Sequence, residues 1–320
     1  MGSANVAVNS WLSDRERFAD LFNGTLFDGK QLIHPEDLED LDRETDILIT
    51  GKSGKTRGLQ RYRDIAKRWK GGSDLMVLAC ESQAKIHYAM PVRNMLYDSL
   101  TYTDQIRQLW GKSADRSGMA GEEYLSSFRK SDQIYPVITL VFYYDLKPWD
   151  GPTDLYGMFG LHENGVADNI IRKYVPNYHI NLLDAGAVRN LKHFQTDLQQ
   201  IFGVLKYRGN KTGLQNYMQE NRDYFTRVNV DAYQALCAFL HSEKMLKEIK
   251  DSGKDVKIDM CQALEELYQD GVKEGREEGI AEGIAAVISN MLKSGMSITD
   301  IKKYTDADDR VIEQVQKDLK

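Results

Sequence analysis

The segment LACESQAKIHYAMPVRNMLYD, residues 78–98, joins the end of an apolar run to a polar cluster and then to a proline. The apolar run starts at Leu75, and its length and composition are typical of a buried strand. It ends in Glu81, Ser82 and Gln83. Because side chains alternate along a strand, Glu81 and Gln83 point to one face and Ser82 to the other. A carboxylate and an amide on one face of so apolar a strand indicate a functional role for that end of the strand.

The sequence around this segment predicts alternating strands and helices. A helix is expected over 89–110, because Pro91 is tolerated in a first turn and Val92, Leu96 and Leu100 share one face. Strands are predicted over 46–50, 61–69, 135–144 and 178–185, a helix over 13–29 with Ser13 as its N-cap, a mobile loop over 111–133, and helices from about residue 187 onward. This order favours an α/β or α+β fold with a central sheet flanked by helices.

Composition excludes several classes of protein. The 320 residues are 42% hydrophobic and 28% charged, as in ordinary globular proteins, and the net charge of −6 rules out nucleic-acid binding through bulk charge. Cys80, Cys237 and Cys261 form no Cys-x-x-Cys pair, so neither a disulfide framework nor a zinc site is predicted, which fits a cytoplasmic protein. The longest apolar run is too short to span a bilayer, so no membrane association is expected.

Two acidic residues predict a metal site at the end of the sheet. Asp64 lies seventeen residues before Glu81, and the two carboxylates converge if their segments pair as neighbouring strands. Together with the backbone carbonyl of Ser82, they form a set of hard oxygen ligands suited to Mg²⁺ or Mn²⁺. Such a cation polarises a phosphoryl oxygen and activates bound water.

Basic residues surround Asp64. Eight bases and one acid occur in residues 52–70, and the four nearest to Asp64 are predicted to bind DNA: Arg61, Arg63, Lys67 and Arg68. The alternative is a charged edge strand that guards against aggregation. The spacing of Glu81 and Gln83 favours the functional interpretation.

The combination of Asp64, Glu81-x-Gln83 and a helix that begins near Pro91 resembles the Rpn family of recombination-promoting nucleases, often labelled transposases, in the PD-(D/E)XK nuclease superfamily. The resemblance extends over residues 14–316 and includes the C-terminal run MLKSGMSITDIKKYT, residues 291–305. It implies a mixed central sheet that carries a divalent-metal DNA endonuclease site. Asp64 and Glu81 match the motif acids, whereas Gln83 stands where the superfamily usually has lysine. The amide of Gln83 can orient the attacking water but carries no positive charge.

Weaker candidates accompany this motif. Asp20 is a possible additional acid or a solvated helix residue, and Arg93 and Tyr97 either face the metal or a phosphate or pack against the sheet edge. Gln105 continues the same helix face, and His87 is expected to be a surface histidine.

The C-terminal region predicts two further parts. Gly271, Gly275, Gly279 and Gly283 recur every four residues in an acidic stretch, which permits close approach of two helices or marks a helix of marginal stability. The predicted parts are a nuclease-like domain over 12–200, a helical extension over 201–261, a Gly/Glu-rich helix over 262–294 that supports a homo-oligomer, and a helix-turn-helix-like tail or plain helical cap over 295–320.

The sequence therefore predicts a Mg²⁺-dependent DNA endonuclease. A catalytically weak module that binds DNA or partner proteins is the alternative, supported by Gln83 and by the long acidic helix. A DDE-type transposase needs a third acid at a suitable position, and the sequence offers none.

Overall fold

The computed structural model describes residues 3–41, 44–50, 56–62, 64–71, 74–112, 118–159, 166–240, 256–305 and 307–318. By its contacts the chain divides into two compact units, residues 1–258 and residues 259–320. The four-part division predicted from the sequence stays a prediction. Within the described ranges, no helix combines the length and the apolar composition that crossing a bilayer requires.

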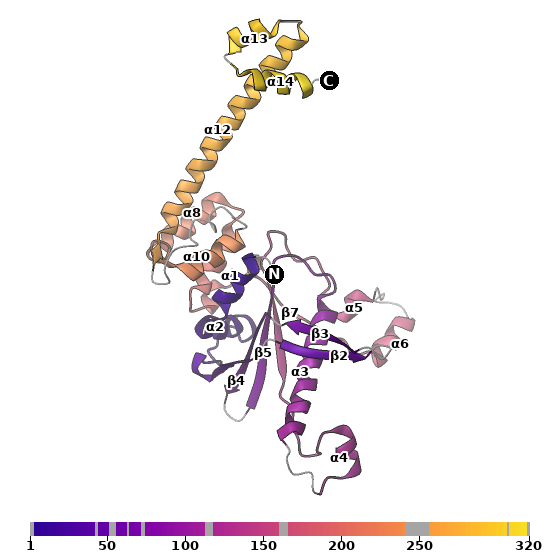
Figure 1. Ribbon diagram of the computed structural model, residues 1–320. Helices are drawn as coiled ribbons and strands as arrows, with labels where there is room; N and C mark the ends of the chain where they lie inside the picture. Colours follow the sequence, from indigo (N-terminus) through magenta and orange to yellow (C-terminus); the bar gives the residue numbers. More distant parts are fainter. Residues whose placement is uncertain are drawn as a thin grey trace. The chain divides into compact units, whose positions relative to one another are not determined.

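A five-stranded mixed sheet organises the first unit (Figure 1). Its strands, in spatial order, are β1 (Leu38–Asp40), β4 (Ile65–Gly71), β5 (Asp74–Gln83), β6 (Val137–Tyr143) and β7 (Asn181–Asp184). The β1–β4 and β4–β5 pairs are antiparallel, and the β5–β6 and β6–β7 pairs are parallel. The predicted mixed sheet flanked by helices is confirmed.

The sheet has two differently covered faces, and the strand register assigns side chains to each. Cys80 pairs with Leu140 and Ser82 with Phe142 on one face, whereas Glu81 pairs with Val141 on the other. We call the first the aromatic face, because the Phe142 ring contacts Phe202 and Phe239 there. Its helices are α1 (Ser3–Leu12), α2 (Arg15–Leu26), α7 (Leu198–Tyr207) and α10 (Val230–Phe239).

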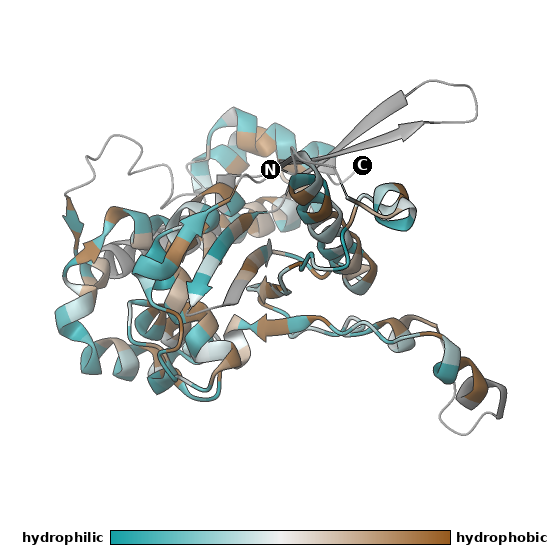
Figure 2. Ribbon diagram, turned by 90° about the horizontal axis from the view of Figure 1, so that it is seen from below, coloured by the Kyte–Doolittle hydropathy of each residue, from teal (hydrophilic) through white to brown (hydrophobic). Residues whose placement is uncertain are grey.

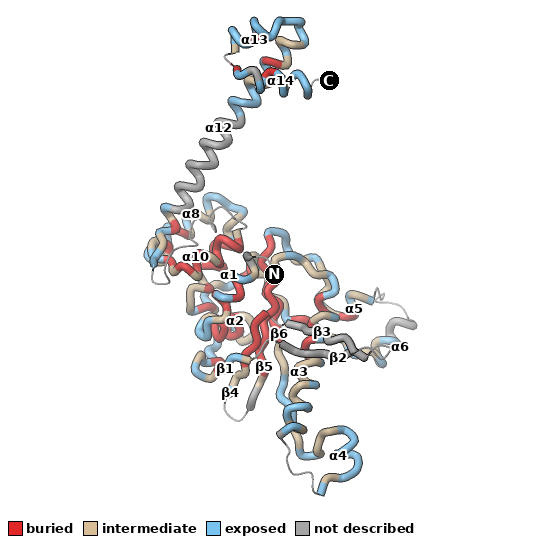
Figure 3. The backbone as a smooth tube through the Cα atoms, in the orientation of Figure 1, coloured by how far each residue is buried: buried red, intermediate tan, exposed pale blue. Residues whose placement is uncertain are grey.

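The opposite face, here the α3 face, is covered by the long helix α3 (Met90–Lys112). Asp98 of α3 accepts a hydrogen bond of 2.6 Å from Thr139 of β6, and Tyr178 donates to the same carboxylate. Burial is concentrated in the strands and in the helices of the aromatic face (Figure 3), and apolar segments of the strands appear brown in Figure 2. The end of the sheet between these layers is where the predicted site falls.

The remaining elements of the first unit are short. They are the hairpin β2 (Glu44–Thr50) and β3 (Thr56–Tyr62), the 3₁₀ turns η1 (Pro35–Asp37), η2 (Ala185–Ala187) and η3 (Leu191–His193), the helices α4 (Gly121–Ser126), α5 (Leu155–Met158), α6 (Val166–Tyr174), α8 (Lys211–Glu220) and α9 (Arg222–Phe225), and the pair β8 (Val228–Asn229) and β9 (Lys257–Ile258).

Four local predictions need correction. Helix α2 is capped by Asp14, whose carboxylate accepts from the amides of Glu16 and Arg17, while the Ser13 hydroxyl donates back to the Asn9 carbonyl. The single strand predicted over 61–69 is divided between β3 and β4. Helix α4 lies within the predicted loop 111–133, and β8 and β9 interrupt the region predicted to be helical. Helix α1 was not predicted.

The second unit is helical. It contains α12 (Met260–Lys293), α13 (Ile298–Thr305) and α14 (Asp309–Asp318). Ile288, Ile301, Ala307 and Ile312 form a small core among them. Gly295, with φ of 78°, adopts the left-handed conformation that favours glycine and follows the end of α12. The helix predicted over 262–294 is confirmed.

Candidate active site

The site begins where β4 starts and β5 ends. Ile65 pairs with Cys80 as the last pair of the antiparallel ladder, and Asp64 and Glu81 are the residues that follow this pair on the two segments. The predicted pairing of the two segments as neighbouring strands is confirmed. Glu81 belongs to the α3 face, and Asp64 lies just outside β4 at the same end of the sheet.

Ser82 adds backbone groups to this corner. Its amide donates a 2.8 Å hydrogen bond to Oδ2 of Asp64, the residue just before β4 starts. The N–H and C=O of one strand residue point to the same neighbouring strand. The carbonyl of Ser82 therefore also points to the edge where Asp64 lies. All three predicted oxygen ligands belong to the same corner of the sheet.

Helix α3 brings a cation to Glu81. The Glu81 side chain is 0% exposed, and its Oε2 accepts from Nη2 of Arg93 at 3.3 Å. The Arg93 guanidinium lies over the Tyr97 ring, 5.4 Å from the ring centre, and Tyr97 is itself buried. Of the two interpretations open for Arg93, the structure places it at the predicted site. Tyr97 supports Arg93 from the next turn of the helix.

A cavity of about 300 Å³ opens at this end of the sheet. Its lining includes Asp64, Ser82, Gln83 and Arg93. The half-buried His87, expected at the surface, also lines it, together with four residues that the sequence did not indicate: Asn5, Ala84, Lys85 and Ile86. Gln83 is 9% exposed, and its backbone carbonyl accepts from the amide of Tyr144 at 3.1 Å. The cavity lining thus joins Gln83 to Asp64, whereas Glu81 is not among the lining residues and reaches the cavity only through its contact with Arg93.

Lys85 was missed because it lies in an irregular turn beyond the strand. Its Nζ is 3.4 Å from Oδ2 of Asp145, and its side chain is 78% exposed. Asn5 was missed because α1 was not predicted; its amide oxygen accepts from the Tyr144 hydroxyl at 2.5 Å. No local sequence pattern joins either residue to Asp64.

The donor set fits a hard divalent cation. Two carboxylates and a carbonyl at one corner match Mg²⁺, which keeps several waters and takes one or two protein carboxylates. The described part of the chain contains no group of three or more His, Cys, Asp or Glu residues that could hold a metal ion. A metal site there would therefore have at most two such side chains as ligands. Burial first, then the negative charges of Asp64 and Glu81, raises the pKa of the Cys80 thiol. The corner therefore carries a negative field that a cation relieves.

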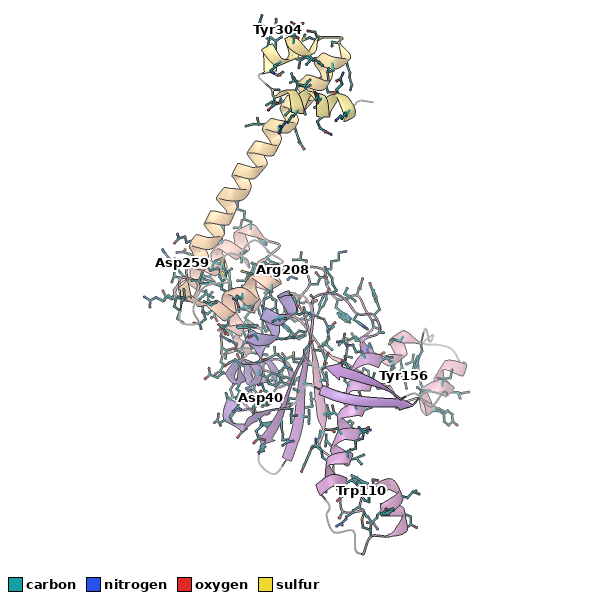
Figure 4. All side chains as sticks on the ribbon, in the orientation of Figure 1. Asp40, Trp110, Tyr156, Arg208, Asp259 and Tyr304 are labelled. Atoms are coloured by element: carbon teal, nitrogen blue, oxygen red, sulfur yellow. The ribbon has the colours of Figure 1, made fainter. Side chains whose placement is uncertain are left out.

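The predicted DNA-binding bases do not form one surface. Lys67 pairs with Leu78 in the ladder and so belongs to the aromatic face, opposite Glu81. Its buried Nζ is 2.5 Å from Oδ1 of Asp40, which Figure 4 labels, and lies over the Phe18 ring. A buried, paired lysine on the far face does not contact DNA at this site, so that prediction is wrong for Lys67.

Arg68 lies on the α3 face, but toward the other end of β4. Its Nη1 is 3.7 Å from Glu39, and it lines a separate cavity with Gln105. The side chain of Arg61 and all of Arg63 lie outside the described residues. The DNA-binding prediction stays open for these three arginines.

Asp20 and Gln105 have structural partners. Asp20 is buried in α2, on the side of the aromatic face, and accepts from the amides of Gln195 and Thr196 and from the Thr196 hydroxyl. Gln105 donates to the Tyr135 carbonyl and accepts from the Tyr135 amide, which fixes the entry to β6. It is twelve residues from Arg93, about 18 Å along the helix. Neither residue joins the site.

Comparison with known proteins adds no relative: no family model, curated protein or solved structure matches this chain. The function of this chain is therefore inferred from its own residues.

Proposed function

We propose that this chain is a divalent-metal-dependent DNA endonuclease with a PD-(D/E)XK-type core, of the kind that the Rpn resemblance implies. One observation carries the proposal: Asp64 and Glu81 both lie directly beyond Ile65 and Cys80, the last pair of the β4–β5 ladder, and the backbone amide of Ser82, between Glu81 and Gln83, donates to Asp64. Recombination, mobile-element biology and phage defence are the settings that the resemblance suggests.

The proposed roles follow from ligand chemistry. Asp64, Glu81 and the Ser82 carbonyl hold Mg²⁺ or Mn²⁺, which supplies Lewis-acid polarisation of the scissile phosphoryl oxygen when bound. Gln83, two residues from Glu81 on the same face, accepts a hydrogen bond from the attacking water and orients its oxygen toward phosphorus. The mostly buried position of Gln83 limits the orientations of its amide, which favours this positioning role.

The second candidate is a nuclease-like module that binds DNA or a partner protein with little cleavage. Two observations favour it: position 83 carries no positive charge, and Arg93 already neutralises one carboxylate of the acid pair. Metal-dependent nicking separates the two candidates, because the binding module retains DNA without cutting it.

The test is incubation of the full chain with supercoiled plasmid, with Mg²⁺, with Mn²⁺ and with a chelator. Wild type is expected to nick the plasmid only with metal, and Glu81→Gln is expected to abolish both nicking and Mg²⁺ binding measured by titration calorimetry. Glu36→Gln, the same change at an exposed carboxylate in η1, is the matched control and is expected to behave as wild type. Equal nicking by wild type and Glu81→Gln contradicts the site.

Gln83 is tested separately. Gln83→Ala is expected to slow single-turnover cleavage by a factor of about 10² to 10³ while Mg²⁺ affinity stays unchanged, since all three metal ligands remain. Gln83→Lys introduces the common superfamily residue and is expected to raise the rate if the cavity accepts a second cation. Equal rates for wild type and Gln83→Ala give Gln83 a structural role only.

A further inference from the structure

Arg93 has an unusual position for a helix residue. It lies in the first turn of the 23-residue helix α3, and no acidic residue accompanies it there. The positive end of the helix dipole disfavours a cation at this position. The contact between its guanidinium and Glu81 offsets this cost. A site that combines an arginine with a helix N-terminus attracts anions through both.

The guanidinium retains capacity for a further ligand. A guanidinium has five N–H donors, and one donates to Glu81. The Arg93 side chain is 30% exposed, and it lines both the cavity of about 300 Å³ beside Asp64 and a neighbouring cavity of about 380 Å³. Arg93 therefore lies where the two cavities adjoin, on the path of a ligand that extends through both.

Charge balance at the site leaves room for one anion. The formal charges of Asp64, Glu81 and Arg93 sum to one net negative charge, and a bound divalent cation changes this sum to one net positive charge. A phosphodiester group, with a single negative charge, then brings the total to zero. The other basic residue at the cavity is Lys85. It forms an ion pair with Asp145 and is largely exposed, so it is less suited to binding the phosphodiester group.

We propose that Arg93 contacts the scissile phosphate through its non-bridging oxygens and stabilises the negative charge that develops on them during hydrolysis. In that step the water oxygen forms a new bond to phosphorus, the bond from phosphorus to the leaving oxygen breaks, and a water proton ends on the leaving oxygen. The products are a phosphate monoester and an alcohol. Arg93 thus supplies the positive charge that Gln83 lacks. This inference rests on the proposed function and names a further catalytic residue for it.

The experiment compares wild type with Arg93→Gln and Arg93→Lys. Single-turnover cleavage at saturating Mg²⁺ is expected to fall by about 10² to 10³ in Arg93→Gln, the size typical of losing one donor to transition-state charge. Arg93→Lys, which keeps the charge without the planar fork, is expected to fall between the two. Mg²⁺ affinity in Arg93→Gln is expected to be unchanged or higher, because a cation that competes for Glu81 has been removed.

Arg172→Gln is the matched control. The Arg172 guanidinium also lies over a tyrosine ring, that of Tyr156 labelled in Figure 4, at 4.6 Å, but it lines neither cavity. This variant loses the same kind of stacking contact and is expected to cleave as wild type. If Arg93→Gln loses activity only because Mg²⁺ binding weakens, so that added metal restores the rate, Arg93 merely positions Glu81 and the inference is overturned.

A binding measurement keeps the two proposals separate. With Ca²⁺ in place of Mg²⁺, the slope of log affinity against log salt for duplex DNA is expected to fall by about 0.9 in Arg93→Gln, since one phosphate contact is lost. If wild type does not nick DNA under any metal, the endonuclease proposal fails, and this slope alone decides the role of Arg93. An unchanged slope overturns the phosphate contact.

Discussion

Replacing Asp20 separates a structural carboxylate from a catalytic one. The Asp20 side chain is buried and accepts at 2.9 Å from the Gln195 amide, at 2.7 Å from the Thr196 amide and at 2.6 Å from the Thr196 hydroxyl. These bonds fasten the segment before α7 to α2. Hydrogen bonds to a charged acceptor contribute about 1.5 to 3 kcal/mol each, and neighbouring contributions do not add fully. We expect Asp20→Ala to lower the free energy of unfolding by about 3 to 5 kcal/mol.

Asp20→Asn is the sharper variant, because its shape is conserved. The amide keeps one acceptor oxygen but turns an NH₂ group toward donors, so both variants destabilise. A loss of 3 kcal/mol corresponds to roughly 6 to 12 °C in melting temperature for a unit of this size. Thermal unfolding followed by circular dichroism measures the shift, and calorimetry measures Mg²⁺ affinity below the transition. An Asp20→Asn protein as stable as wild type that no longer binds Mg²⁺ refutes the structural role and restores Asp20 to the site.

Three further outcomes follow from the same contacts. Lys67→Met is expected to leave the salt dependence of DNA binding unchanged, because Lys67 is buried on the aromatic face; a slope lower by about 0.9 contradicts that placement. Burial first, then Asp145, Asp184 and Asp150, raises the pKa of Tyr143 to about 12 from an ordinary value near 10. The folded state therefore holds this proton longer than the unfolded chain, so stability falls as pH rises from about 10 to about 12. Denaturant titrations should show a smaller fall in Tyr143→Phe, and an equal fall assigns the effect to other groups. Truncation before Glu265 is expected to lower the mass seen by light scattering while Mg²⁺ affinity stays intact, and an unchanged degree of association removes the dimer role of α12.

The pairing of the segments that carry Asp64 and Glu81 was predictable because the relevant signals are local. An apolar run marks β5, alternation assigns each strand side chain to a face, and the short distance in sequence between β4 and β5 favours an antiparallel pair. The same alternation also explains why the DNA-binding prediction is wrong for Lys67. Three positions after Asp64, an odd offset places a strand side chain on the opposite face. The charge of the segment 52–70 obscured this geometric signal.

Other parts of the fold depend on contacts for which the sequence offers no spacing rule. Arg17 of α2 makes two hydrogen bonds to Asp197, at 2.8 and 3.0 Å, and one of 2.5 Å to Asp231, residues 180 and 214 positions away. Burial lowers the pKa of Arg17, but the two carboxylates more than compensate and the net shift is upward. Asp20 is explained by the same kind of distant partner. The sequence alone does not distinguish an acidic helix residue that faces solvent from one that binds a metal or one that bonds to a segment far along the chain.

Gln83 and Arg93 illustrate how the residue at a motif position and the residue that supplies the expected charge can be different. The motif fixes a backbone position two residues after Glu81, but a phosphate responds to charge and distance, regardless of which element delivers the cation. In this chain α3 crosses the face on which Glu81 lies, and its first turn places Arg93 3.3 Å from that carboxylate. A lysine at position 83 would add a second positive charge to a corner where one cation already contacts one of two acids. Under the proposed function, the pair Gln83 and Arg93 therefore leaves the site with the formal charge that a divalent metal and one phosphodiester complete, and the amide of Gln83 positions a neutral water.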